Sequence, residues 1–394
     1  MEKKINNPED FSLSAGGPFH NILVKMGLHN EQGKLAIVCV CFTWLPLLII
    51  TTIEGTLFSG TQLPFISDVA MHARVLVALS MLIMIKVVID TNVNAVTKYI
   101  SDALITGAVG QIVLIRTLRR AKKLTNSVIT EIILILIVII TTISMVKGGA
   151  YSSLGEGTTS WMTTSVQQGD TGLSVAGYWA VFISIPTFQF FLFRWLWRYF
   201  VWILLLFRLS RTTIDLLPTH ADGAGGLGIV MLAQRSFNLI FVAGSVVISG
   251  QFIAEIIDQP DTFNVIRNKV IGYIIICIVF IFIPLLFFTG KLFTTKYKGL
   301  TRLSILGATL SRKFEGEWVN DLPIEKRIEE SKVDPSMLYD YFGLYEALQK
   351  LRTVPITLLD ILGMAIVLFI PFIPILFIHF SVAELLQKIA GLLA

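Results

Sequence analysis

Long apolar runs alternate with polar stretches along the whole chain. Seven windows carry about 20 mostly apolar residues each, the length that an α-helix needs to cross a membrane. Because lipid offers no hydrogen-bond partners, helices are the expected form, and the ten-residue alternation of a transmembrane β-strand is absent. The pattern predicts an all-α polytopic membrane protein with spans at 35–53, 69–89, 128–146, 175–197, 237–257, 270–289 and 356–380.

Two of these windows leave alternatives open. The fourth runs on from Val175 to Ser210 with Pro186 as its only breaker. A continuous helix there would be about 54 Å long, would kink near Pro186 and would extend beyond the membrane. The last window contains Pro371 and Pro374. It either crosses with a kink or turns back as a re-entrant hairpin, which gives seven or six crossings.

Basic residues gather in every second connection. Residues 1–34, 90–127, 198–236 and 290–355 contain 25 Lys and Arg, whereas the intervening connections and the C-terminal tail contain 4. Since basic loops stay in the cytoplasm, the N-terminus is predicted inside and, with seven crossings, the C-terminus outside. The polar N-terminus has no apolar core of a cleavable signal peptide.

The chain is therefore expected to have four parts. These are a cytoplasmic N-terminal segment, a six-helix transmembrane region, a helical cytoplasmic subdomain, and a last transmembrane or re-entrant helix with its tail, at 1–34, 35–289, 290–355 and 356–394.

Three stretches outside the spans have patterns of their own. Residues 112–123 form either a basic helix on anionic headgroups or an extension of the third crossing. Residues 147–174, rich in Gly, Ser and Thr, are expected to form a flexible cap. Residues 336–352 have helical spacing and are expected to pack on the cytoplasmic region or on a neighbouring subunit, with one face formed by Leu338, Phe342, Tyr345, Leu348 and Leu351.

Composition supports the membrane assignment. Hydrophobic residues make up 54% and charged residues 15% of the chain, and the mean hydropathy is +0.74, whereas soluble proteins are about 25% charged. Disorder, a fibrous protein and most soluble enzymes are thereby excluded. The net charge of +5 follows from the basic loops, so no nucleic acid is expected. Cys39, Cys41 and Cys277 lie in apolar runs and are expected to act as small core residues, without a metal or cofactor.

The segment PTHADGAGGLG at 218–228 is the densest motif. Its G-x-G-x-x-G spacing lacks the βαβ setting of a dinucleotide site. Its glycines allow a sharp turn between packed helices, or their free N–H groups hold an anion or carboxylate. The acidic residues and the histidine form either part of a divalent-ion site or, as favoured here, a hydrogen bond that fixes the loop. The proposed cytoplasmic gate or latch comprises Asp215, His220, Asp222, Gly223, Gly225, Gly226 and Gly228.

This segment, together with Gly16-Gly17-Pro18 and Trp44-Leu45-Pro46, resembles a group of uncharacterised bacterial multi-pass inner-membrane proteins with an H-x-D-x-A-G-G-L-G segment. The resemblance implies a bacterial inner-membrane location. It implies no activity and no catalytic residues.

Charges within the spans suggest a transport path or a structural clamp. His72 and Arg74 lie in the outer third of the second span. An ion pair of Arg74 would be either a clamp or the entry to a polar cavity. Lys86, near the inner end, is expected to snorkel to the interface. Candidate carboxylate partners of Arg74 are Glu54, Asp68, Glu255 and Asp258.

Arg194 and Arg198 lie four residues apart among Trp and Tyr residues, a pattern typical of the membrane–water interface. We expect lipid-headgroup anchoring, with an anion vestibule as the alternative. Gln189 and Gln251 are the deepest uncharged polar residues of their helices. Each needs a partner, or water in a pore.

Three functions remain after these exclusions. The first is a channel or transporter for an ion or small solute, with a tilt toward an anion from the embedded positive charges. The second is a non-transporting sensor, scaffold or effector subunit whose cytoplasmic loop binds a protein. An enzyme acting on lipid-linked substrates would have only Asp215 and Asp222 near the glycine-rich turn, so no enzyme is predicted. Membrane lipids and a homo-oligomer or membrane complex are the expected partners.

Overall fold

A computed structural model describes residues 11–147, 159–165, 171–258, 262–316 and 334–379. Helices dominate these residues, and seven are long and apolar enough to cross a membrane. The prediction of an all-α polytopic membrane protein is confirmed. The seven spans are Gln32–Ile53, Val69–Ala103, Val128–Lys147, Val175–Ser210, Leu227–Ile257, Phe263–Phe314 and Leu358–Ile378.

The elements before residue 180 include the only two described strands. The antiparallel pair β1–β2 is short, and π-helical turns continue α3 and α7 at Ala73–Ala78 and Ala180–Ser184. The elements are α1 (Pro18–Lys25), α2 (Gln32–Ile53), α3 (Val69–His72), α4 (Leu79–Ala103), α5 (Ala108–Thr125), α6 (Val128–Lys147), β1 (Thr163–Ser165), β2 (Thr171–Leu173) and α7 (Val175–Trp179).

The elements after residue 180 are helical throughout the described residues. Short 3₁₀ turns lie among them at Leu227–Ile229, Ile283–Phe288 and Ile370–Phe372, and one more lies earlier in the chain at Phe65–Ser67. The helices are α8 (Ile185–Ser210), α9 (Val230–Asp258), α10 (Phe263–Phe282), α11 (Thr289–Phe314), α13 (Pro335–Gln349), α14 (Leu358–Phe369) and α15 (Ile373–His379).

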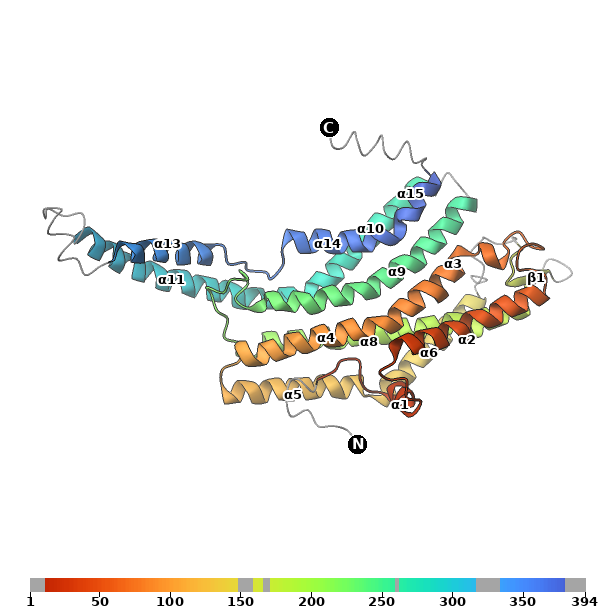
Figure 1. The fold of residues 1–394 in the computed structure, drawn as a ribbon, viewed down its shortest axis with the longest axis horizontal. Helices are drawn as coiled ribbons and strands as arrows, with labels where there is room; N and C mark the ends of the chain where they lie inside the picture. The colour runs from red at the N-terminus through yellow and green to blue at the C-terminus, as the bar shows by residue number, and fades with distance from the viewer. Residues whose placement is uncertain (1–10, 148–158, 166–170, 259–261, 317–333, 380–394) are drawn as a thin grey trace.

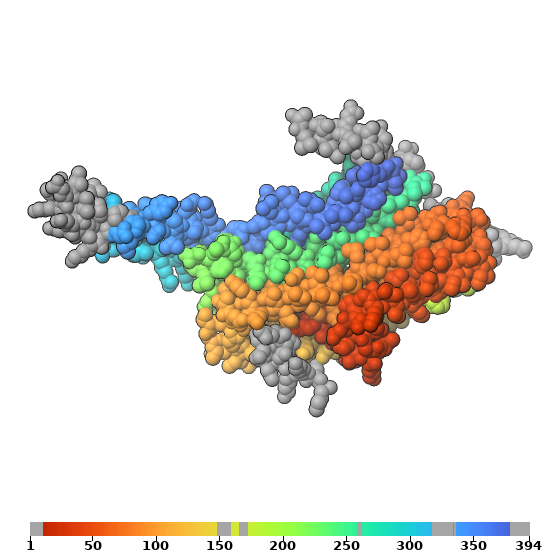
Figure 2. Space-filling model, viewed as in Figure 1, coloured from red at the N-terminus to blue at the C-terminus, as the bar shows by residue number. Residues whose placement is uncertain are grey.

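The helices form an elongated bundle with two different ends (Figure 1). The β1–β2 hairpin lies at one end, called here the hairpin end. From the other, the arm end, α11 and α13 project side by side as an arm that stands clear of the bundle (Figure 2). Within the bundle, α9 runs between α4 and α14 (Figure 1).

Helix lengths locate the membrane. The 22 residues of α2 and 20 residues of α6 correspond to about 30–33 Å, the thickness of a hydrocarbon core. The spans of 35 and 36 residues at Val69–Ala103 and Val175–Ser210 are about 53 Å long. Both therefore extend beyond the membrane at the arm end, as predicted for the fourth span.

Pro284 interrupts the sixth span, and a side-chain hydrogen bond covers the carbonyl that it leaves free. Pro284 cannot donate to the carbonyl of Phe280, and the Tyr199 hydroxyl donates to that carbonyl at 3.0 Å. In the last span, the carbonyl of Pro371 accepts from the Ser249 hydroxyl at 2.6 Å, which joins this span to α9. This span continues through its prolines as one helix of 21 residues. The described residues thus form a crossing and not a re-entrant hairpin.

The structure bears on the three segments outside the spans that have sequence patterns of their own. Helix α5 packs along α8 and buries Leu114 and Leu118, so its apolar face contacts protein, as an extension of the bundle would. The described part of 147–174 is ordered around the fully buried Trp161. In α13, Leu348 is buried against α11, but Phe342 is 57% exposed and does not join that face.

Candidate functional site

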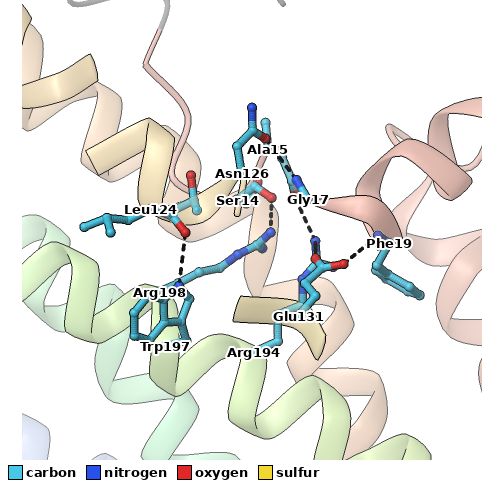
Figure 3. Close-up of polar contacts among 12 residues, drawn as sticks. Ser14, Ala15, Gly17, Phe19, Leu124, Asn126, Glu131, Arg194, Trp197 and Arg198 are labelled. Carbon is cyan, nitrogen blue, oxygen red and sulfur yellow. Dashed lines mark hydrogen bonds and ion pairs between the residues drawn. The ribbon is translucent and has the colours of Figure 1, made fainter. Parts of the chain in front are cut away.

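Arg194 and Arg198 lie on α8 and hold the N-terminal segment, residues 11–17 (Figure 3). They are only 7% and 5% exposed. Nη2 of Arg198 donates to the carbonyl of Ser14, and Nη2 of Arg194 donates to the carbonyl of Gly16 at 3.1 Å. Expected anchoring in lipid headgroups is therefore wrong for these two side chains. Backbone carbonyls occupy the place that the alternative gave to an anion.

The aromatic residues beside these arginines also donate inward. Nε1 of Trp195 donates to the carbonyl of Leu82 at 2.6 Å, and Nε1 of Trp197 to that of Leu124 at 3.4 Å. The interface pattern in the sequence hence marks contacts between helices. Lys86, expected to snorkel, donates through Nζ to the carbonyl of His29.

Glu131, in the first turn of α6, joins α8 to α1. Its Oε1 lies 3.2 Å from Nη2 of Arg194, and both side chains are less than 10% exposed. Its Oε2 accepts from the backbone N–H of Phe19 at 2.7 Å and so caps the N-terminus of α1. Oδ1 of Asn126 accepts from the N–H of Gly17 at 2.9 Å. The carboxylate of Glu131 thus forms an ion pair with a buried arginine and, at the same time, accepts a hydrogen bond from a free N–H group at the start of α1.

The two glycines of the Gly16-Gly17-Pro18 motif make this approach possible. Their φ angles are +117° and +89°, in a region that L side chains rarely adopt. A Cβ at Gly17 would lie 2.3 Å from Oε1 of Glu131, and one at Gly16 would lie 1.9 Å from Oδ1 of Asn126. Only glycine fits both positions.

The rest of the N-terminal segment is part of the core. Phe11 and Leu13 are fully buried. Ser14 donates to the carboxylate of Asp90 on α4, through its N–H at 3.0 Å and through its hydroxyl. The segment therefore connects α4, α6 and α8, although the sequence analysis assigned it no role.

His20 gives this site a pH dependence. Burial, together with the positive charges of Lys86, Arg194 and Arg198, lowers the pKa of His20 from 6.5 to about 4. Between these values the unfolded state binds more protons than the folded state, so stability falls as the pH drops through this window. We expect the melting temperature to fall between pH 7 and pH 5, and less so in His20→Gln. An equal fall in both proteins would contradict the assignment to His20.

In the glycine-rich turn, the expected anion is a carboxylate of the turn itself. Oδ1 of Asp222 accepts from the N–H groups of Ala224 at 2.9 Å and Gly226 at 3.1 Å, and Oδ2 accepts from Gly228 at 2.8 Å. Burial raises the pKa of Asp222, but these bonds and one from His220 outweigh it, and the net pKa is lowered. The turn has positive φ at Gly223, Gly225 and Gly226.

The turn contacts α4 on one side and the segment that follows α13 on the other. The hydroxyl of Tyr99 lies 3.1 Å from Nε2 of His220, and Nδ1 of His220 lies 2.9 Å from Oδ1 of Asp222. On the other side, the N–H of Arg352 donates to the carbonyl of Gly223 at 2.9 Å, and its guanidinium donates to the carbonyl of Asp222 at 2.6 Å. These contacts hold the turn between α4 and the residues that follow α13.

Asp215 does not join this pair. Its N–H donates to the carbonyl of Leu104 at 2.8 Å, and its exposed carboxylate accepts from the hydroxyl of Thr106. Leu104 also leaves no room for a side chain at position 226, because a Cβ on Gly226 would lie 2.7 Å from Cδ2 of Leu104. The hydrogen bond between His220 and Asp222 is thus formed, but Asp215, the third residue of the alternative divalent-ion site, takes no part in it.

His72 and Arg74, near the hairpin end, have different surroundings. Nδ1 of His72 accepts from Nε1 of Trp44 at 3.1 Å. Arg74 lies in a π-helical turn and makes no ion pair among the described residues. Its expected partner Asp68 accepts instead from Nε1 of Trp161 at 3.0 Å.

The other expected partners of Arg74 are also engaged elsewhere. Glu54 accepts from the N–H of Val175 at 2.9 Å. Glu255 forms an ion pair with Lys269 at 2.9 Å. The side chain of Asp258 lies outside the described part. Among the described side chains, the expected Arg74–carboxylate pair is therefore not formed.

The two glutamines do not share one environment. Oε1 of Gln189 accepts from the hydroxyl of Thr141 at 3.1 Å, which joins α8 to α6. Gln251 is exposed on α9. A single polar path past both glutamines and Arg74 has no support from these positions.

Taken together, the polar residues build two connections, one through the N-terminal segment and one through the glycine-rich turn. Asp90, Asn126 and Glu131 were missed in the sequence. Of these, only Glu131 had a visible signal, as an acidic residue in the first turn of an apolar helix. The connections position helices and offer no activated nucleophile. Comparisons with protein-family models, curated proteins and solved structures find no match for the chain.

Proposed function

We propose that the protein is a non-transporting scaffold or sensor of the bacterial inner membrane, whose arm binds a cytoplasmic protein partner. The observation that carries this proposal is the arm. Helices α10 and α11 form one continuous helix of 52 residues, Phe263–Phe314, so the arm is directly joined to a membrane span.

The surface of the arm supports an interaction role. On α13, Tyr339 is 81% and Phe342 57% exposed, and their spacing of three residues places them on one helix face. On α11, Tyr297 and Ile305 are 66% and 67% exposed. Tyr339 and Phe342 are thus neighbours, and exposed apolar side chains that adjoin one another outside the membrane are typical of surfaces that bind proteins.

The arm is also fixed in place. Nζ of Lys296 donates to the carbonyls of Gln349 at 2.7 Å and Leu351 at 2.8 Å, at the C-terminal end of α13. Gly299 and Gly307 allow close packing, because a Cβ there would meet Leu348 and Tyr341. A preformed surface loses little conformational entropy on binding.

The embedded charges favour this role over transport. Arg194 pairs with Glu131, and Glu255 pairs with Lys269. Such contacts join helices and do not line a common path. The distribution of 25 against 4 basic residues supports an N-terminus and an arm on the cytoplasmic side.

Photo-crosslinking in intact cells tests the arm surface. A photoreactive residue at Tyr339 is expected to give one discrete crosslinked species, which Phe342→Ser weakens at least about fivefold because both residues lie on one face. The control position is the exposed Arg120 on α5. The same species from Arg120, or no effect of Phe342→Ser, would argue against an arm-specific partner.

Chloride flux into vesicles that contain the purified full chain tests the alternative. We expect no flux that depends on the protein, and no difference between the wild type and Arg74→Ala. A protein-dependent flux that Arg74→Ala abolishes would establish the anion-transport hypothesis in place of ours.

A further inference from the structure

A groove of about 430 Å³ lies between α4, α9 and α14, which Figure 1 shows side by side. Asp360 is the third residue of α14 and Arg235 lies near the start of α9. The groove therefore opens at the arm-end boundary of the apolar spans. The exposed Val88 and Leu359 line it, so its mouth has an apolar rim.

Most polar groups of the groove satisfy one another. Nη2 of Arg235 pairs with Oδ1 of Asp360, and Oδ2 of Asp360 accepts from the N–H of Thr357 at 2.9 Å and from its hydroxyl at 2.6 Å. The hydroxyl of Ser236 accepts from Nδ2 of Asn92. Asp360 thus orients Arg235 and has little capacity left for a ligand.

Two polar groups have unused hydrogen-bonding capacity, one exposed and one buried in the wall of the groove. The side chain of Arg235 is 61% exposed and its guanidinium makes no other polar contact among the described residues. Asn238 is 3% exposed; its Nδ2 donates to the carbonyl of Met364 at 3.4 Å, but its Oδ1 has no partner among them. A buried acceptor without a donor is costly. The two groups lie about 4.5 Å apart along the axis of α9.

We propose that the groove binds a lysophospholipid, a glycerophospholipid with one acyl chain and a free hydroxyl. Its phosphate meets the open N–H groups of Arg235, and its hydroxyl donates to Oδ1 of Asn238, one turn deeper. Phosphate and hydroxyl occupy neighbouring glycerol carbons, so one molecule reaches both groups. A diacyl phospholipid has an ester in place of that hydroxyl and therefore has no donor on that glycerol carbon.

The apolar part of the groove suits a single chain. Leu239, Met364 and Val367 line it beyond Asn238. Gly363 lies between the polar and apolar parts, and a Cβ there would meet nothing within 4 Å. The space beside Gly363 is therefore open for a chain. This proposal does not rest on the function proposed for the arm.

Native mass spectrometry of the purified full chain tests it. The probes are palmitoyl-lysophosphatidylcholine and dipalmitoyl-phosphatidylcholine, whose shared headgroup has no N–H or O–H donor. We expect the lyso lipid to bind at least about tenfold more tightly, because only it satisfies Asn238. Arg235→Gln is expected to weaken binding of both lipids about tenfold. Asn238→Leu is expected to remove the preference for the lyso lipid.

Gly363→Leu fills the groove and is expected to abolish binding without changing a polar group. Its matched control is Gly272→Leu on α10, where a Cβ also meets nothing within 4 Å and which does not line this groove. Binding that survives Gly363→Leu, or equal binding of the two lipids by the wild type, would overturn the proposal. Absence of binding by the wild type would overturn it as well.

Discussion

Glu131→Gln is expected to lower the free energy of unfolding by about 3–5 kcal/mol, because it leaves the buried charge of Arg194 without its partner. Glu131 also accepts from the N–H of Phe19, so the same change weakens the cap of α1. Unfolding by sodium dodecyl sulfate in mixed micelles, followed by tryptophan fluorescence, measures the loss.

An exposed ion pair provides the control. Glu346 and Lys350 lie on α13 with side chains 64% and 73% exposed, and Glu346→Gln is expected to change stability by less than about 1 kcal/mol. Equal effects of Glu131→Gln and Glu346→Gln would mean that the Arg194 pair does not fix the N-terminal segment.

Asp222→Ala is expected to open the glycine-rich turn. Three N–H groups lose their acceptor, and hydrogen bonds to a charged group contribute about 1.5–3 kcal/mol each. Local opening of the turn should become easier by about 3 kcal/mol in all, after allowance for its partial exposure. Hydrogen exchange of residues 222–228 is therefore expected to accelerate about a hundredfold.

Asp215 provides the control, because its removal takes away a nearby negative charge without removing the acceptor of the three N–H groups. Asp215 is exposed and accepts only from Thr106 by its side chain among the described residues. Asp215→Ala is expected to leave exchange of residues 222–228 unchanged. If both variants accelerate exchange equally, the amide contacts of Asp222 do not hold the turn.

The membrane spans were predictable because the bilayer imposes one length and one composition on every crossing. All seven windows fall on observed helices. Hydropathy alone does not locate the helix ends, since polar residues continue a helix in water. The helix predicted at 270–289 therefore extends in the structure from Phe263 to Phe314.

The sites were less predictable because their partners are far apart in sequence. Arg194 and its acceptor Gly16 are 178 residues apart. In addition, a sequence in which Trp and Arg are adjacent does not indicate whether these side chains face lipid or protein. In the glycine-rich turn the contacts are local, between Asp222 and residues up to six positions away. There the sequence indicated a bound carboxylate without indicating its source.

Helix α11 continues α10 through the 3₁₀ turn Ile283–Phe288 and projects from the bundle as part of the arm. The 26 residues of α11 extend about 39 Å, so each 10° of tilt displaces the far end of α11 by about 7 Å. Membrane-spanning helices adjust their tilt to the thickness of the surrounding bilayer. If α10 passed such a change of tilt on to α11 through that turn, the tip of the arm would move by several ångströms, toward another molecule or away from it.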